Sequence, residues 1–401
     1  MRLNTFTLAI ASLAALAIST SALAQKKYDT GADDKEIKIG GISPYSGPAS
    51  AYGAIGKAIG AYIEKVNAEG GINGRKIKWI SLDDGYNPAK TVEQARKLVE
   101  EDEVLFVFNT LGTPPNSAIH KYMNTKKVPQ LFVATGATKW GDPKNFPWTM
   151  GWQPNYQSES KVFAGHIMET KPNAKIAILY QNDDYGKDYL KGFEDGLGDK
   201  AKTMIVSKIS YEVTDPTIDS QMVSLKGTGA DTFFNITTPK FAAQAIKKAA
   251  ELGWKPAHYL NSVSASVGSV MIPAGAENGV GIYTASYLKD PTDPQFQKGK
   301  EWDDWLAWMK KYQPNGDVKD VNNVYGYTAA QGLVQVLKQA GDNLTRDNIM
   351  KQAASLDMTL PMLLPGVNVK TGPDDFFPIE REQLAKFDGK TWVLFGKVYG
   401  R

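Results

Sequence analysis

Residues 36–67 read EIKIGGISPYSGPASAYGAIGKAIGAYIEKVN, and this stretch defines the structural unit that recurs along the chain. Glu36 to Ile42 is a short, mostly apolar run that is typical of a buried strand. Ser50 to Asn67 follows, with apolar side chains at steps of three and four residues. This spacing places them on one face of a helix. These positions are Ile55, Ile59, Tyr62, Ile63 and Val66.

The same alternation of strand and helix continues after Gly70-Gly71, which is expected to end the first helix. Asn87-Pro88 has the residue types that begin a helix. Further strands are predicted at 76–84, 104–110, 128–135, 175–183, 203–211, 231–237, 258–262 and 279–287, and further helices near 117–123, 185–196 and 241–252.

This βαβ order predicts parallel sheets flanked by helices. A second run of the pattern begins at Lys175, and a chain of 401 residues suggests about two domains. We therefore expect two α/β lobes with a cleft between them. Ligands of open parallel sheets bind beyond the carboxyl ends of the strands. The candidate segments are 43–52, 110–115, 134–138, 182–186, 237–239 and 262–266.

Two aromatic features late in the chain are interpreted as structural. Asp388-Gly389 lies between two short strand-like runs in residues 383–395 and predicts a tight hairpin turn. In residues 301–312, Trp302, Trp305 and Trp308 recur at helical spacing, which favours packing between helices over a partner interface.

The first residues have the form of a secretory signal. Phe6 to Ile18 is an apolar run of about 13 residues, against roughly 20 needed to span a bilayer. Ala22-Leu23-Ala24 has the small-x-small form that predicts cleavage before Gln25. Residue 25 is not cysteine, so we expect a periplasmic protein without a lipid anchor.

Composition excludes several other functions. The chain has 46 basic and 43 acidic residues with no basic tract, which argues against a nucleic-acid partner. It has no cysteine, and its three histidines are too scattered to hold a metal. No G-x-S-x-G elbow or phosphate loop is present. We therefore expect no cofactor and no enzyme activity. Turnover of a ligand by the pure protein would revive the enzyme hypothesis, which otherwise rests on the fold alone.

Several segments, in this order and spacing, resemble the periplasmic leucine/isoleucine/valine-type binding proteins of ABC transporters. The resemblance runs from Ile37 to about Phe395. The segments that carry it are IKIGGISPYSGPASAYG, NAEGGINGRKI, DDGYNPAKTVEQARKLV, VPQLFVATGAT, KIAILYQNDDYGKDYLKGF and NVYGYTAAQGLVQVLKQAG.

The resemblance implies the α/β, two-lobed type I periplasmic binding protein fold, in which the chain crosses between the lobes three times. A signal peptide would occupy residues 1–24, one lobe residues 36–152 plus 283–360, and the other residues 153–282 plus 361–401. A ligand would bind between the lobes as they close. An ABC permease in the inner membrane would then recognise the closed form. We expect a monomer.

The resemblance also implies a set of ligand-binding positions. In the family, two loops of one lobe hold a carboxylate. They match Gly112 and Thr113 here, followed by Ala134, Thr135 and Gly136. Aromatic positions that line the family's cleft match Tyr52 and Tyr185, and Thr238 falls close to another. The acid that holds an amino acid's ammonium group aligns at Val263.

The last of these positions has consequences for the ligand. Residues 261–267 contain no Asp or Glu, and a buried ammonium without a carboxylate is costly. We hypothesise an aromatic or aliphatic carboxylate, with backbone amides at Gly112 and Gly136 receiving its oxygen and Trp152 beside its body. A branched-chain amino acid or an amide is the alternative, with Asp183, Asp184 or Glu277 supplying the acid. A sensor that serves a membrane receptor is the second alternative.

Overall fold

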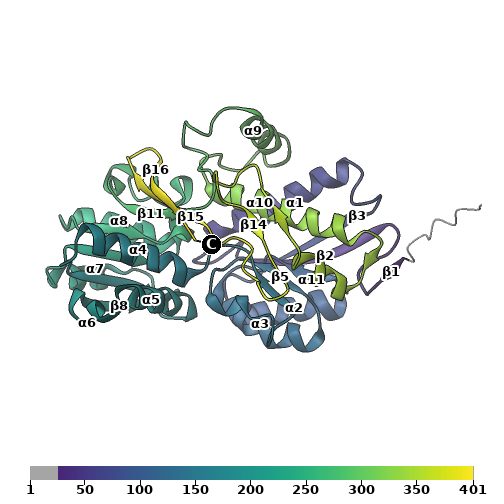
Figure 1. Ribbon diagram of the computed structural model, residues 1–401, viewed down its shortest axis with the longest axis horizontal. Coiled ribbons are helices and arrows are strands. Elements are labelled where there is room, and N and C mark those ends of the chain that lie inside the picture. The colour runs from purple at the N-terminus through teal and green to yellow at the C-terminus, as the bar shows by residue number, and fades with distance from the viewer. Residues whose placement is uncertain (1–25, 401) are drawn as a thin grey trace, which may run out of the picture.

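The computed structural model describes residues 26–400 and has two α/β lobes side by side (Figure 1). The predicted signal peptide lies outside these residues. The sheet of the first lobe has five strands, and every neighbouring pair is parallel. In spatial order they are β3 (Lys76–Asp83), β2 (Glu36–Ser43), β4 (Phe106–Phe108), β5 (Gln130–Val133) and β6 (Thr149–Gly151).

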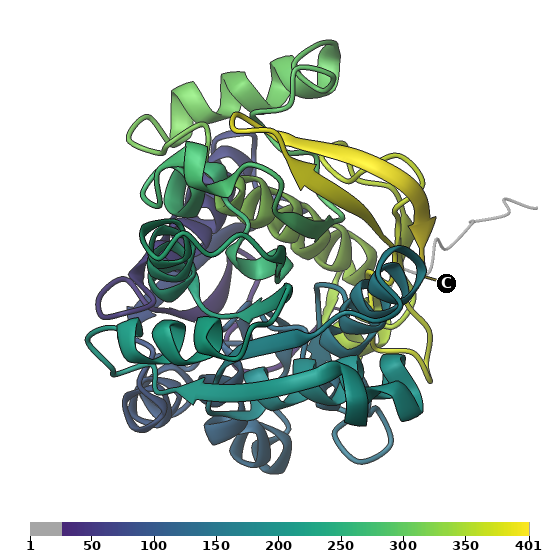
Figure 2. The ribbon, with the colours of Figure 1, turned by 90° about the vertical axis from the view of Figure 1, so that its left-hand side faces the viewer.

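The second lobe contains a seven-stranded sheet that is parallel except at one edge. Figure 2 shows that edge as the yellow hairpin. In spatial order the strands are β16 (Trp392–Tyr399), β15 (Glu382–Phe387), β11 (Tyr283–Ser286), β10 (Ala257–Leu260), β9 (Thr232–Ile236), β7 (Ile176–Gln181) and β8 (Ile205–Tyr211).

Helices cover both sheets. Those of the first lobe are α1 (Gly53–Ala68), α2 (Pro88–Arg96), α3 (Thr113–Lys126), α9 (Lys300–Tyr312), α10 (Val321–Ala340) and α11 (Arg346–Ala353). Those of the second are α4 (Tyr156–Thr170), α5 (Asp184–Leu197), α6 (Ala201–Met204), α7 (Asp219–Gly227) and α8 (Pro239–Glu251). Within residues 26–400, no helix has the length and apolar character to cross a membrane.

Short elements complete the chain. The brief helical turns are η1 (Ser50–Tyr52), η2 (Lys97–Glu101), η3 (Thr138–Gly141), η4 (Gly198–Lys200), η5 (Ser262–Ser264), η6 (Val267–Met271) and η7 (Ala276–Gly279). The two-residue strands are β1 (Lys27–Tyr28), β12 (Asn343–Leu344), β13 (Asp357–Met358) and β14 (Val369–Lys370). β1 pairs with β12, and β13 with β14.

The apolar runs of the sequence become strands that are buried on both faces. Phe106 and Phe108 of β4 pack into one core of the first lobe, and Val107 between them packs into the other. β7 alternates in the same way: Ile178 and Leu179 enter different cores of the second lobe. Because successive side chains of a strand point to opposite faces, continuous apolar runs are needed where helices cover both faces.

The structure confirms two predictions about individual helices. Asn87 caps α2 by accepting hydrogen bonds from the backbone of Ala89 and Lys90. Trp305 and Trp308 are buried in the first lobe's core, as the packing interpretation of the tryptophan-rich helix requires.

The hairpin predicted around Asp388-Gly389 is present, since β15 and β16 pair antiparallel, but its loop is longer than the two-residue turn expected. Phe387 pairs with Trp392, so the hairpin loop has four residues, 388–391. The Asp388 side chain closes it by accepting from the backbone N–H groups of Lys390 and Thr391. An aspartate can thus support a longer loop than the dipeptide alone suggests.

Two crossings between the lobes differ from the sequence expectation. β11 is paired on both sides within the second sheet, so Tyr283–Ser286 does not belong to the first lobe. Val367, Val369 and Phe376 pack into the first lobe's core, so residues 361–379 do not belong to the second. We place the crossings after Gly151, after Ser286 and near Pro378. Short apolar runs do not reveal which sheet they join, and this is why the boundaries were misplaced.

Candidate functional site

One cavity lies between the two sheets, at the carboxyl ends of their parallel strands. The first lobe contributes Tyr52, Ile55, Tyr86, Leu111, Gly112, Thr113, Ala134, Val321, Asn322 and Tyr325. The second lobe contributes Tyr185, Thr238, Ser262, Val263, Ala265, Thr284, Ala285 and Trp392. The segments at the crossings add Gln153, Tyr156, Ser286, Tyr287, Leu288 and Asp290.

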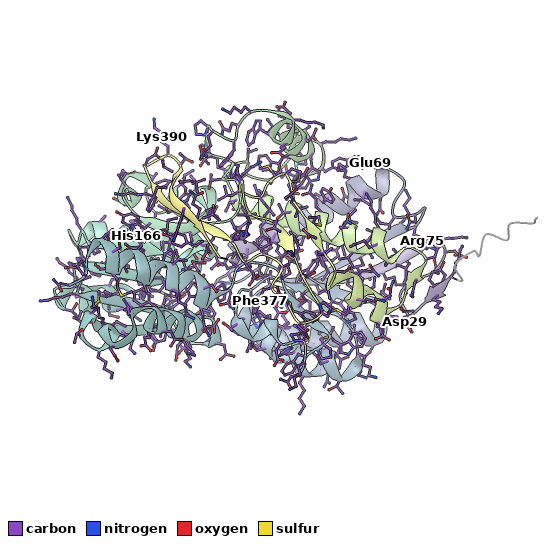
Figure 3. All side chains as sticks on the ribbon, viewed as in Figure 1. Asp29, Glu69, Arg75, His166, Phe377 and Lys390 are labelled. Atoms are coloured by element: carbon purple, nitrogen blue, oxygen red, sulfur yellow. The ribbon has the colours of Figure 1, made fainter. Side chains whose placement is uncertain are left out.

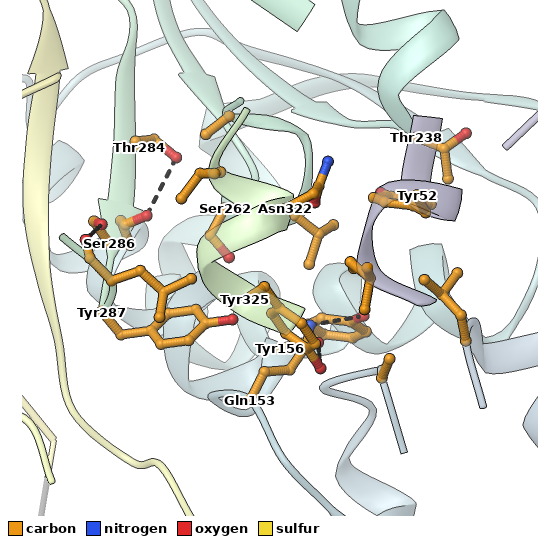
Figure 4. Close-up of a pocket in the computed structure, with 18 of the residues that line it drawn as sticks. Tyr52, Gln153, Tyr156, Thr238, Ser262, Thr284, Ser286, Tyr287, Asn322 and Tyr325 are labelled. Carbon is orange, nitrogen blue, oxygen red and sulfur yellow. Dashed lines mark hydrogen bonds between the residues drawn. The ribbon is translucent and has the colours of Figure 1, made fainter. Parts of the chain in front are cut away.

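Phenol rings form much of the cavity wall. Tyr52, Tyr156, Tyr287 and Tyr325 come from four separate segments of the chain and lie around the pocket in Figure 4. Burial raises the pKa of Tyr52, Tyr86 and Tyr287 well above its ordinary value, so these phenols are uncharged at neutral pH. A wall of neutral phenols offers apolar ring faces together with hydroxyl groups.

The Tyr185 hydroxyl is buried in this wall without a hydrogen bond among the described residues. The Tyr185 side chain is 2% exposed, and its Oη is buried with no partner among the described residues. Its ring packs edge-on against Tyr156, with ring centroids 5.5 Å apart. Since buried hydroxyls are almost always paired, a ligand atom is the natural partner of this one.

A second unfilled hydrogen-bonding group lies at the start of α3. Thr113 Oγ1 and Thr135 Oγ1 are 2.6 Å apart. Thr135 Oγ1 already accepts from the Ala137 N–H and from Trp140 Nε1, each at 3.3 Å. Its own proton is therefore best directed to Thr113, which leaves the Thr113 hydroxyl proton free to donate into the cavity.

The backbone adds a further donor at the same place. Thr113 is the first residue of α3, where N–H groups have no acceptor within the helix. In the part of the chain that the structure describes, no acceptor contacts the Thr113 N–H. The positive end of a 14-residue helix and a free hydroxyl together favour an anionic oxygen.

The Gly112 amide is not bare, contrary to the prediction, and Gly136 does not line the cavity. The Gly112 N–H donates to the Ala134 carbonyl at 3.2 Å. A side chain on Gly112, which has φ +97°, would lie 2.4 Å from the Tyr86 ring. One on Gly136 would lie 2.2 Å from the Pro154 carbonyl oxygen. Both glycines thus permit close packing around the cavity, and the donor is Thr113.

Polar side chains hold the first crossing in place. Tyr325 Oη donates to Gln153 Oε1 at 3.1 Å, and Gln153 Nε2 donates to Tyr156 Oη at 3.4 Å (Figure 4). This chain links α10 of the first lobe to the start of α4 in the second. The positions of the Tyr156 and Tyr325 rings are therefore coupled to the crossing segment.

A buried glutamate supports the loop after β10. Glu159 of α4 accepts from the Ser262 N–H at 2.8 Å and from Ser262 Oγ at 2.6 Å. Ser262, Val263 and Val321 are only half-buried, unlike most of the lining. Burial raises the pKa of Glu159 to about 7. For Glu382, burial and the nearby Glu159 carboxyl together raise the pKa well above its ordinary value.

The lobes also touch on both sides of the cavity. On one side, the Thr138 N–H donates to Asp188 Oδ2 at 2.8 Å, and Lys139 Nζ lies 2.6 Å from Asp184 Oδ2. On the other, Ser266 Oγ donates to Asp320 Oδ1 at 2.8 Å. These contacts, with the buried lining, define a closed arrangement of the lobes.

The family model described as "periplasmic binding protein" matches residues 36–390. The chain belongs to this family. The curated relatives include the Leu/Ile/Val-binding protein homolog 7 of Brucella suis biovar 1, which is 24% identical over 337 residues, covering 81% of this chain and 82% of the relative.

Solved structures share the fold of this periplasmic binding protein. A branched-chain amino acid ABC transporter protein from Thermus thermophilus with bound valine has a TM-score of 0.81 at 16% identity, covering 92% of this chain and 97% of its own. A solute binding protein from R. palustris in complex with 4-hydroxybenzoate has a TM-score of 0.76 at 16% identity, covering 91% and 97%. The family is one of solute-binding proteins, non-enzymatic in general.

Most positions expected from the resemblance line the cavity of this binding protein. These are Tyr52, Gly112, Thr113, Ala134, Tyr185, Thr238 and Val263. Thr135 and Gly136 lie behind the wall, beneath Thr113 and Tyr156. Trp152 is fully buried against Phe132 in the first lobe and does not line the cavity.

The acids proposed for an amino-acid ligand lie elsewhere. Asp183 caps α5, Asp184 pairs with Lys139, and Glu277 is exposed. The acid in the lining is Asp290, which the sequence analysis did not identify. It follows β11, so the strand-end rule could have found it had that strand been assigned to the second sheet.

Proposed function

We propose that this protein is the solute-binding component of an ABC importer and that it captures an aromatic or aliphatic carboxylate between its lobes. The observation that carries the proposal is the pair of free donors on Thr113, its hydroxyl and its N–H, which face a cavity walled by neutral phenols. A carboxylate would accept from both donors, and the rings would enclose its apolar body.

The position of the acids favours this ligand over an amino acid. An amino acid carries its ammonium group one carbon away from its carboxylate. Tyr86, Gly112 and Ala134 surround Thr113 in the lining, and none of them is acidic. The bound 4-hydroxybenzoate of the R. palustris structure supports an aromatic carboxylate, and the bound valine of the Thermus thermophilus structure supports the amino-acid alternative.

The test is a binding screen on protein that has been unfolded and refolded to remove any carried-over ligand. The panel contains leucine, valine, benzoates, phenylpropanoates and aliphatic acids. A ligand that binds only the folded state raises the melting temperature. We expect a carboxylate without an α-amino group to give the largest shift. A largest shift from leucine or valine would replace our proposal with the amino-acid alternative.

Substitution of Thr113 tests the anion site itself. Thr113→Val keeps the shape of the side chain but removes its hydroxyl. A hydrogen bond to a charged group contributes about 1.5–3 kcal/mol, so affinity for the carboxylate should fall at least tenfold. Calorimetric titration measures it. Thr125→Val, at an exposed position in the last turn of α3 and outside the lining, is the control and should bind normally.

Export to the periplasm and an ABC permease partner are part of the same proposal. Uptake of the labelled ligand by cells with and without this gene tests the transport role. Unchanged uptake together with a lost behavioural response to the ligand would instead favour the sensor alternative.

A further inference from the structure

The cavity extends beyond the strand ends to a second, chemically different end, which we call the Asp290 end. It is formed by Ala265, Ser286, Asp290, Asn322 and Trp392. Hydrogen bonds join these segments: Trp392 Nε1 donates to the Ala265 carbonyl at 2.6 Å, and Thr292 Oγ1 bonds to Thr391 Oγ1 at 2.9 Å. In Figure 4, Ser286 lies at the opposite side of the view from Tyr52 and Thr238.

Asp290 offers an acceptor at this end. Asp290 is 6% exposed, and its Oδ1 accepts hydrogen bonds from the N–H and the hydroxyl of Thr292, at 2.8 Å and 2.5 Å. Within residues 26–400, no donor is recorded for Oδ2. Burial, the larger cause, and the neighbouring acids Asp293 and Asp320 raise the pKa of Asp290 to about 6.

No cation in the lining compensates this carboxylate. The lining contains no Lys, Arg or His. The adjacent Lys289 is turned to Glu301 and to the Pro361 carbonyl. At neutral pH, Asp290 is therefore a mostly ionised group in a buried wall, which is unfavourable until a donor or a positive charge reaches it.

The rest of the Asp290 end suits the last part of an apolar ligand. Because the Trp392 N–H is already bonded, the ring presents only carbon to the cavity. The Asn322 amide has one long contact, from Nδ2 to Ser269 Oγ at 3.5 Å, and can rotate to serve a ligand atom. An apolar wall with two polar side chains fixes the orientation of a ligand's terminal group.

We propose that the ligand has two polar ends: a carboxylate held by Thr113 and, at the opposite end of its apolar body, a hydroxyl or ammonium group that donates to Asp290. This inference rests on the proposed function and names its substrate class. It distinguishes ω-hydroxy or ω-amino carboxylates from simple benzoates and fatty acids, which would leave Asp290 unpaired.

Three probes that share the 3-phenylpropanoate skeleton test this proposal by calorimetric titration. They are 3-phenylpropanoate, 3-(4-hydroxyphenyl)propanoate and 3-[4-(aminomethyl)phenyl]propanoate. In the unmodified protein, at least one donor-bearing probe should bind ten times more tightly than 3-phenylpropanoate. Asp290→Asn keeps an acceptor oxygen but removes the charge. It should weaken the hydroxyl probe about tenfold or less and the ammonium probe about a hundredfold, so the two donors are told apart.

Asp293→Asn is the matched control, because Asp293 is buried in the same loop but does not line the cavity. It should leave the affinities for 3-phenylpropanoate and the hydroxyl probe unchanged and weaken the ammonium probe far less than Asp290→Asn does, because the Asp293 carboxylate acts on Asp290 from outside the lining. A readout without ligand is also available: Asp290→Asn should raise the melting temperature of the ligand-free protein at pH 8, where the native carboxyl is ionised.

The outcomes separate the two proposals. If all three probes bind equally and Asp290→Asn changes nothing, the Asp290 end is not a binding subsite, while the carboxylate proposal stands. If no carboxylate of any kind binds, the proposed function fails and this inference fails with it.

Discussion

Among single residues, Tyr185 carries a hydroxyl that the folded chain leaves unpaired. It differs in this from Tyr211, whose Oη donates to Gln181 Oε1 at 2.9 Å and accepts from the Thr238 N–H at 3.0 Å. An unpaired buried hydroxyl costs stability, whereas a paired one contributes to it. Removing each hydroxyl therefore has opposite consequences.

Tyr185→Phe should raise the stability of the ligand-free protein by about 1 kcal/mol and weaken ligand binding roughly tenfold. Tyr211→Phe, the control, should lower stability by a similar amount. Chemical denaturation and calorimetric titration measure the two quantities. Unchanged affinity in Tyr185→Phe would show that the ligand does not contact this hydroxyl.

At the level of elements, α5 and η3 join the lobes through Asp188. Its carboxylate accepts from the N–H and the hydroxyl of Thr138 in the first lobe, at 2.8 Å and 3.0 Å. Lobe closure around a ligand depends on the free-energy difference between open and closed states. Contacts made only when the lobes are closed therefore add to affinity.

Asp188→Ala should weaken ligand binding by about three- to tenfold, because its two hydrogen bonds to the first lobe, of about 1 kcal/mol or less each, are lost. Its third hydrogen bond, accepted from Gln157 Nε2 at 2.7 Å, lies within the second lobe. The change should come from faster dissociation, which stopped-flow measurements resolve. Lys191→Ala is the control: it breaks an exposed ion pair with Asp195 within α5 and should leave binding unaltered. A similar loss in both variants would point to damage to the helix rather than to closure.

For the whole molecule, the buried Glu159 and Glu382 make stability depend on pH. Burial raises both pKa values above the 4.5 of a free glutamate, that of Glu159 to about 7. Between these values the folded state binds more protons than the unfolded state. The linkage relation then requires stability to fall as pH rises from about 4.5 through 7 and beyond.

Glu382→Gln should reduce this loss, because it leaves one carboxyl where there were two. From pH 5 to pH 9, the unfolding free energy of the original protein should fall relative to that of the variant. Urea titrations at several pH values measure it. The histidines with lowered pKa, His120, His166 and His258, are common to both proteins and cancel in the difference. A difference independent of pH would contradict the expectation.

The sequence predicts the fold well because its signals are local. The strand at Glu36 and the helix cap at Asn87 both follow from a few neighbouring residues, and the structure has both. The sheet membership of β11 depends on its neighbours β10 and β15, and β15 is about 100 residues later in the chain. No local pattern reports such pairing.

The residues of the candidate site likewise fall into those that the sequence could predict and those that it could not. Tyr52, Thr113 and Tyr185 follow strand ends, so the topology rule and the family resemblance both lead to them. Tyr287 and Asp290 lie in a crossing segment, and Trp392 begins a hairpin strand. They reach the cavity because β11 and the hairpin belong to the second sheet, and the strand-end rule leads to Asp290 only when that membership is known.

The start of the described chain is fastened at the outer end of the first lobe. β1 pairs with β12, and Arg75 reinforces it by donating to Tyr28 Oη at 2.6 Å and to Asp342 at 2.7 Å. Asp29 and Arg75 lie at that end in Figure 3, whereas the C-terminus lies near the middle of the molecule in Figure 1. An immobilisation tag or a fused reporter placed just before β1 would thus leave both lobes free to move, while the same addition at the C-terminus would crowd the region where they join.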